Sequence, residues 1–233
     1  MGFDFERFWL EKLRGRLEVD LGPEAAGELM AGSESLSDES SEEERTAWTR
    51  DLLRRLTEAA GEAAAREIML GCACLPSRAE LEEARKVYAE TGSLESARQV
   101  LERDFRDFLT SGLGLAEDAA EEIIARGWGM AGVIDDGRII ATKIPKSGNL
   151  REYLAETDPE RRRALYCHCP RARRLVGSDR ELPELYCYCG GGFYRFIWEY
   201  VLDAPVQVEL LASVMGGDDV CSFAVTPLDR SVD

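Results

Sequence analysis

The sequence contains little histidine and little positive charge. Of its 233 residues, one is histidine (His168), and 29 lysines and arginines stand against 45 aspartates and glutamates. A single histidine nearly excludes a Ser-His-Asp triad and a metal site built from several histidines. The net charge of −16 argues against nucleic acid and anionic lipid as partners, because binding to either requires a basic surface.

Long apolar runs are also missing. No stretch approaches the roughly 18 apolar residues that a membrane span needs. The N-terminus lacks the basic segment followed by an apolar run that marks an export signal. We therefore expect a cytoplasmic protein with no membrane partner.

The residues that are present can build a sizeable core, since 45% are hydrophobic and 32% are charged. The first part of the chain, residues 1–127, shows helical periodicity throughout. This periodicity predicts helices over residues 1–18, from a cap at Ser40 or Ser41 to about Leu70, and over 78–90, 93–112 and 117–127. We therefore expect residues 1–127 to form a helical region.

The pattern changes after residue 127. Apolar β-favouring residues flank Asp136-Gly137, which predicts a hairpin. Segments 164–169 and 184–189 read as extended, residues 190–202 as a helix, and 206–214 and 220–226 as strands. We expect an α+β fold, in which the helical region is followed by an antiparallel sheet with packed helices, and a ligand- or metal-binding domain over 128–233.

Cysteine carries most of the chemical information. Six of the seven cysteines form Cys-x-Cys pairs, and the seventh stands alone. An odd number of cysteines without an export signal argues against a set of structural disulfides. The candidate metal ligands are therefore all seven thiols: Cys72, Cys74, Cys167, Cys169, Cys187, Cys189 and Cys221. The alternative is that the cysteines are buried as small hydrophobic side chains.

Two of the pairs recur in a Leu-Tyr-Cys-x-Cys pattern, at 165–169 and at 185–189. On an extended segment, residues i and i+2 point to the same face, so two such segments side by side would bring four sulfurs together. Four converging thiolates suit zinc, with iron as the alternative metal. The glycines at 190–192 open a helix whose N-terminus lowers the pKa of a nearby thiol, which makes Cys189 the best candidate for a reactive or ligating thiolate.

The basic residues around the first pair have two interpretations. Six arginines cluster there, at Arg161, Arg162, Arg163, Arg171, Arg173 and Arg174. They form either a solvated basic face or a binding site for an anionic substrate. His168 lies between Cys167 and Cys169 and faces away from them on a strand, so we expect a surface or packing role, with a ligand or general-base role as the alternative.

The C-terminal part resembles a known family. The run from Cys187 through the three glycines to Glu199, the segment 205–209 and the Gly-Asp-Asp-Val-Cys-Ser-Phe motif ending at Phe223 are similar to the 4-vinyl reductase (hydrocarbon-binding) domain. The resemblance covers residues 160–228 and implies a structural zinc beside a pocket for a small aromatic ligand. Cys187 or Cys189, together with Cys221, match the family's cysteines, whereas a further family cysteine falls near Ser213. The extra pairs Cys167/Cys169 and Cys72/Cys74 are candidates to supply the missing ligand.

The same C-terminal part has a looser similarity to L-2-amino-thiazoline-4-carboxylic acid hydrolases. Three functions remain open. The resemblance favours a zinc-thiolate protein of the hydrocarbon-binding type that binds a small molecule. The alternatives are a cysteine- or zinc-dependent hydrolase or reductase acting on a small organic substrate, which includes anionic ones, and a thiol redox or metal-handling protein. The sequence does not decide whether the protein forms a homodimer.

Overall fold

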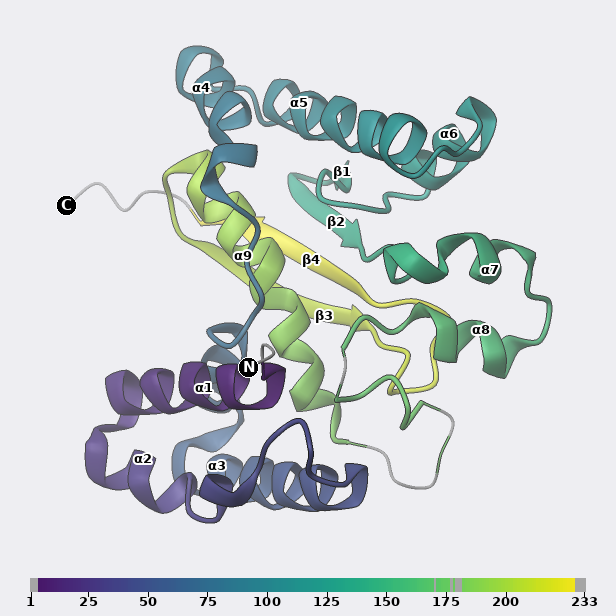
Figure 1. Cartoon of the computed structure of the whole chain (residues 1–233). Coiled ribbons are helices and arrows are strands. Elements are labelled where there is room, and N and C mark those ends of the chain that lie inside the picture. Colours follow the sequence, from purple (N-terminus) through teal and green to yellow (C-terminus); the bar gives the residue numbers. More distant parts are fainter. Residues whose placement is uncertain (1–3, 170, 177, 179–181, 229–233) are drawn as a thin grey trace.

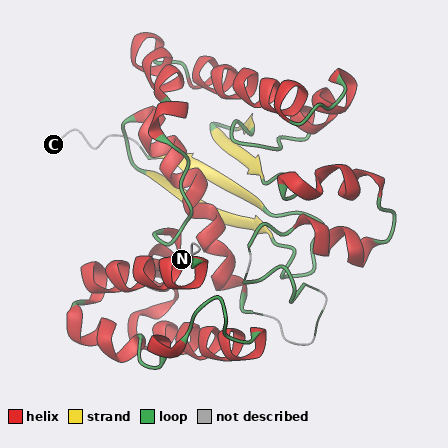
Figure 2. Cartoon of the chain, viewed as in Figure 1, coloured by secondary structure: helices red, strands yellow, loops and turns green. Residues whose placement is uncertain are grey.

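The computed structural model describes residues 4–169, 171–176, 178 and 182–228. It confirms the expected α+β class, with helices packed around one antiparallel sheet (Figures 1 and 2). The α-helices are α1 (Phe5–Leu21), α2 (Pro23–Leu29), α3 (Glu42–Leu70), α4 (Glu82–Thr91), α5 (Leu94–Asp107), α6 (Glu117–Ala125), α7 (Leu150–Ala155), α8 (Pro159–Tyr166) and α9 (Tyr188–Leu202). The strands are β1 (Val133–Asp135), β2 (Arg138–Thr142), β3 (Val206–Ala212) and β4 (Ser222–Pro227).

The sheet has the strand order β1-β2-β4-β3, and all neighbours are antiparallel. Strands β1 and β2 form the expected hairpin around Asp136 and Gly137. Both turn residues have positive φ, 48° and 75°, as a type I′ turn requires. The predicted cap of the long helix is also present: the Ser41 side chain accepts from the Glu44 N–H, and the Glu44 carboxylate accepts from the Ser41 N–H.

One face of the sheet carries most of its buried apolar side chains. Its buried side chains alternate along paired strands, as a half-buried sheet requires: Ile139, Ala141, Val208, Phe223 and Val225. Helix α9 lies across this face (Figure 1). On the opposite face Gln207, Glu209 and Leu211 are exposed.

The N-terminal helices form two groups at opposite ends of α9 (Figure 1). Helices α1–α3 lie near its start, where α3 packs against it, and helices α4–α6 lie toward its other end. Arg85 of α4 donates to the Tyr200 carbonyl at 2.7 Å and to Asp203 at 2.8 Å, so it caps the C-terminus of α9. Segment 71–81 joins the two groups and crosses in front of α9.

The buried side chains form two clusters, and each combines residues from before and after residue 127. In the first, Trp9 and Leu13 of α1 pack with Tyr166, Tyr186 and Val214. In the second, α4 and α5 pack with α9 and the sheet. The boundary at 127/128 therefore separates helical from mixed secondary structure, and both cores cross it. Among the described residues, no helix combines the length and the apolar character needed to cross a bilayer.

Candidate functional site

The two Leu-Tyr-Cys-x-Cys segments are not extended, so that prediction is wrong. Residues 165 and 166 end α8, and 167–169 follow as an irregular loop. Residues 184–187 form a 3₁₀ turn that leads directly into α9. Cys189 lies inside the first turn of α9 rather than ahead of it. Because successive residues turn by roughly 100° in a helix, residues i and i+2 point in different directions and the pair does not share a face.

The hydrogen bonds of the sulfurs follow from this local structure. Cys187 Sγ accepts from the Ser213 hydroxyl at 3.2 Å, in the connection between β3 and β4. Cys189 Sγ points toward the end of α3 and donates to the Cys72 carbonyl at 3.4 Å. Cys169 Sγ lies 3.2 Å from the Tyr186 hydroxyl. The sulfurs of the second pair thus contact different elements of the fold.

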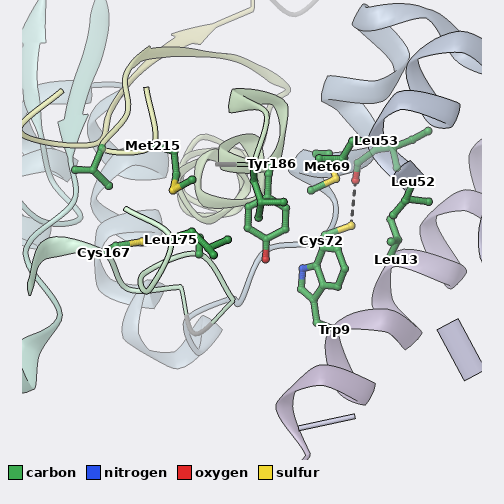
Figure 3. Close-up of a cluster of buried hydrophobic side chains, with 14 of the residues drawn as sticks. Trp9, Leu13, Leu52, Leu53, Met69, Cys72, Cys167, Leu175, Tyr186 and Met215 are labelled. Carbon is green, nitrogen blue, oxygen red and sulfur yellow. Dashed lines mark hydrogen bonds between the residues drawn. The ribbon is translucent and has the colours of Figure 1, made fainter. Parts of the chain in front are cut away.

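Cys72 ends the long helix and is buried in the first hydrophobic cluster (Figure 3). Its thiol donates to the Ile68 carbonyl at 3.3 Å, the bond drawn dashed in Figure 3. Trp9 and Tyr186 lie close to it in the same view, with ring centroids 5.7 Å apart. Cys72 therefore behaves as the small hydrophobic residue that the alternative interpretation expected.

The other cysteines line one cavity of about 730 Å³ between the two helical groups. The six lining cysteines are Cys74, Cys167, Cys169, Cys187, Cys189 and Cys221. Aromatic rings form much of the remaining wall, contributed by both helical groups and by the C-terminal part: Phe5, Trp9, Phe105, Phe108, Tyr166, Tyr186, Phe193, Tyr194 and Phe223. The volume falls within the range of about 300–1,000 Å³ that is typical of small-molecule sites.

Lys143 is the one lysine or arginine among the described residues that line this cavity. Tyr166 fixes its backbone, because the Tyr166 hydroxyl donates to the Lys143 carbonyl and accepts from the Cys221 N–H at 3.1 Å. The Lys143 N–H in turn donates to the Cys221 carbonyl at 2.9 Å. Through this network the end of α8 holds the adjacent ends of β2 and β4, and with them Lys143 and Cys221, in place.

Burial dominates the electrostatics of the thiols. It raises the pKa of Cys167 and of Cys189 to about 12, and the neighbouring Cys169 adds to both shifts. Burial also raises the pKa of Cys72, Cys187 and Cys221. These five thiols are therefore protonated at neutral pH, and their side chains are neutral.

Helix α1 is tied to the cysteine-bearing loop by a buried ion pair. Arg171 Nη2 lies 2.8 Å from Glu6 Oε1 and donates to Thr49 Oγ1 at 2.7 Å. The guanidinium also lies 4.1 Å from the centre of the Trp9 ring. Burial raises the pKa of Glu6, and Arg171 opposes this shift. The pair positions Trp9, which lines the cavity, against the loop that carries Cys167 and Cys169.

The arginine cluster lies elsewhere. None of its six members is among the described residues that line the cavity. Arg171 is paired with Glu6 as described, Arg162 lies over the Tyr153 ring at 4.7 Å, and Arg163 donates to the Gly217 carbonyl at 3.2 Å. His168 lines the cavity, and its Nε2 lies 2.7 Å from the Ile144 carbonyl. The cation of the cavity is thus Lys143, which the sequence analysis did not single out although it directly follows an apolar strand.

Six sulfurs share a cavity, and their grouping bears on the predicted metal site. Within the described part of the chain, no group of three or more histidine, cysteine, aspartate or glutamate side chains is placed to hold a metal ion, and all seven cysteines are free. The helical geometry at 187–189 separates the second pair, because it directs Cys187 toward Ser213 and Cys189 toward the Cys72 carbonyl. As they stand, the side chains do not fit the tetrahedral four-sulfur set that the sequence suggested.

Comparison with known proteins gives one match. Residues 161–232 match a family of unknown function (DUF6144). This segment contains Tyr166 and five of the six cavity cysteines but excludes Cys74, Lys143 and Trp9. Neither a curated protein nor a solved structure matches the chain. The resemblance to the 4-vinyl reductase domain stays a prediction.

Proposed function

We propose that the protein binds a small, mainly apolar organic molecule in the cysteine-lined cavity. The observation that carries this proposal is the cavity itself, about 730 Å³ in volume and walled by aromatic rings and thiols. Because burial raises the pKa of the thiols, most of that wall is uncharged at neutral pH. An apolar ligand gains free energy from leaving water for such a wall, at about 25 cal/mol per Å² of apolar surface.

The two helical groups supply opposite sides of the site. Phe5 and Trp9 come from α1, whereas Phe105 belongs to α5 and Phe108 follows it. Five of the six thiols and Phe193 come from the C-terminal part, and Cys74 comes from the segment between α3 and α4. A ligand between these walls would contact segments that are far apart in sequence, so it should stabilise the whole fold rather than one element.

The test uses the neutral fluorophore N-phenyl-1-naphthylamine, whose emission rises in apolar surroundings. Titration into the wild-type protein should give saturable binding near one equivalent and a raised melting temperature. Met130 lines the cavity and is partly buried, so Met130→Trp should fill space and weaken binding about tenfold. Leu154→Trp, at an exposed position on α7, is the matched control and should bind like the wild type. Equal affinity of all three proteins would contradict the proposal.

A thiolate-bound zinc or iron ion is the second candidate, because six sulfurs line one cavity. Binding would require the sulfurs to leave their present hydrogen bonds and lose their protons. Elemental analysis of protein purified anaerobically without chelators decides this point. About one metal per chain, lost in Cys187→Ser and Cys221→Ser, supports the candidate. A metal-free protein that still binds the fluorophore would contradict the metal candidate and support the apolar-ligand proposal.

A further inference from the structure

The charge on Lys143 is held against the start of α9. A Cβ atom built on Gly190 would lie 3.2 Å from the Lys143 Nζ, so the ammonium lies beside the first turn of this helix. It also lies over the Phe193 ring, 5.8 Å from the centroid. The main chain of Lys143 is fixed by Cys221 and Tyr166, as described above. The ammonium therefore has a defined place on the cavity wall.

No acidic group compensates this charge within the described part of the chain. Two carboxylates line the cavity, and both have other partners: Glu80 accepts from the Ser77 N–H at 3.2 Å, and Asp104 lies 2.7 Å from Arg103. The first turn of α9 contains no acidic residue, and no side chain caps it. The 3₁₀ turn 184–187 runs directly into α9, and the Tyr188 N–H donates to the Leu185 carbonyl of that turn. The positive charge at this place is therefore that of Lys143.

The remaining polar side chains of the wall are neutral. The thiols of Cys167, Cys189 and Cys221 feel the positive charge of Lys143, yet burial outweighs it and keeps the pKa of each raised. They cannot serve as thiolate counterions at neutral pH. Burial and Lys143 both lower the pKa of His168, so the imidazole is neutral as well and adds no second cation.

We propose that Lys143, which lies beside the start of α9, forms an anion subsite of the cavity, so that the natural ligand is an apolar organic anion such as an aromatic carboxylate. This inference rests on the proposed function, since it names the class of ligand that the cavity binds. The aromatic and thiol walls would enclose the apolar body, and the carboxylate would accept a charge-assisted hydrogen bond from the ammonium. The low local dielectric strengthens such a bond relative to one in water.

The test compares two fluorophores that differ by one sulfonate. These are 8-anilinonaphthalene-1-sulfonate and N-phenyl-1-naphthylamine, the same ring system with and without the charge. The variants are Lys143→Met and its matched control Lys146→Met, a lysine of the same loop that does not line the cavity. We expect Lys143→Met to weaken the sulfonate about tenfold and the neutral probe less than twofold. Lys146→Met should change neither, and Lys143→Arg should restore most of the sulfonate affinity.

The outcomes separate the two proposals. If the neutral probe binds and Lys143→Met weakens both probes equally, or neither, the anion subsite is wrong and the apolar cavity stands. If Lys146→Met weakens the sulfonate as much as Lys143→Met, the effect is one of overall charge, and the subsite is again wrong. If neither probe binds the wild type, the result contradicts both the proposed ligand-binding function and the anion subsite. Thermal unfolding of each variant establishes that it is folded.

Discussion

At the scale of single residues, burial decides the chemistry of the thiols. Cys189 lies in the first turn of α9, a position that by itself lowers a thiol pKa. The desolvation of its buried sulfur acts in the opposite direction and is larger, so its pKa rises to about 12. Cys74, by contrast, is exposed at the edge of the cavity. The cysteine that the sequence marked as most reactive is thus among the most protected.

We predict that Cys74 reacts first with iodoacetamide in the folded protein. A pKa of about 12 for Cys167 and Cys189, against 9.0 for an ordinary thiol, lowers the thiolate fraction at pH 8 by about a thousandfold. Alkylation followed by peptide mass spectrometry should show Cys74 as the fast site, absent in Cys74→Ser, with Cys167 and Cys189 labelled only after denaturation. Rapid labelling of Cys189 in the folded protein would contradict the argument.

The buried ion pair of Glu6 and Arg171 gives a second prediction at this scale. Glu6→Leu leaves a buried guanidinium with neither its counterion nor the oxygen that accepts from it, which should lower the free energy of unfolding by about 3 kcal/mol. The double variant Glu6→Leu/Arg171→Met removes both charges and should lie within about 1 kcal/mol of the wild type, since buried pairs are often replaceable by apolar residues. Urea unfolding of the wild type, both single variants and the double variant measures the coupling. Additive losses would show that the pair is not coupled.

The same pair predicts a pH dependence. Because the pKa of Glu6 is raised above 4.5 in the folded protein, the folded state binds more protons than the unfolded state above this pH. The contribution of Glu6 to the free energy of unfolding is therefore fully present below pH 4.5, and it is lost as the pH rises through the raised pKa. The stability of the wild type relative to Glu6→Gln should fall over this window. A relative stability that increases there would mean that Arg171 outweighs desolvation.

At the scale of elements, the glycines of α9 allow it to lie close to α3. A Cβ atom on Gly192 would stand 1.8 Å from the Leu70 carbonyl oxygen and 2.9 Å from the Ala73 side chain. Gly191 would meet the Leu70 side chain and Phe223 at 3.0 Å. Gly191 and Gly192 therefore serve close packing of a helix, and this contact fixes where Cys189 lies relative to α3.

This packing predicts a large effect for a small change. Gly192→Ala should destabilise the protein by about 3 kcal/mol or more, because the added methyl group meets main-chain atoms that cannot move without shifting α3. Gly15→Ala is the control: Gly15 lies in α1 with no atom within 4 Å of an added Cβ, and alanine there should stabilise by about 0.5–1 kcal/mol. Thermal and urea unfolding measure the change in stability of both variants. A small loss of stability in Gly192→Ala would mean that α9 does not pack this tightly against α3.

The sequence predicted the elements whose signals are local. The hairpin follows from Asp136-Gly137, and the start of α3 follows from the serine cap and its acidic first turn. The extended prediction for the cysteine segments is wrong because it follows β-favouring Tyr and Cys, whereas α8 runs into the first segment and α9 begins within the second. The local pattern predicts a helix that opens at the glycines after Cys189, but it does not show why they are glycines, since that need arises from Leu70, more than a hundred residues away.

At the scale of the whole molecule, the site is a product of the tertiary fold. The sequence marked all seven cysteines as candidates, of which six share the cavity, but it did not show why these six lie together. The walls come from α1, from α5, and from the loops around β2 and α9, which no spacing rule links. Lys143 becomes significant only because β2 ends beside α9. The sequence therefore indicates which residue types form the site. The shape of the cavity and the place of the Lys143 charge depend on the tertiary fold.

The overall charge leads to a last prediction. The chain carries a net charge of −16, so an anionic ligand must approach against a repulsive field before it reaches the cation in the cavity. Salt screens this long-range field, whose decay length is about 10 Å at 0.1 M, more strongly than the short contact with Lys143. In stopped-flow experiments the association rate of 8-anilinonaphthalene-1-sulfonate should therefore rise as salt increases from 10 to 150 mM, whereas that of N-phenyl-1-naphthylamine should stay constant. An anion rate that falls with salt would show that a local positive field governs entry, and that the acidic surface lies away from the path.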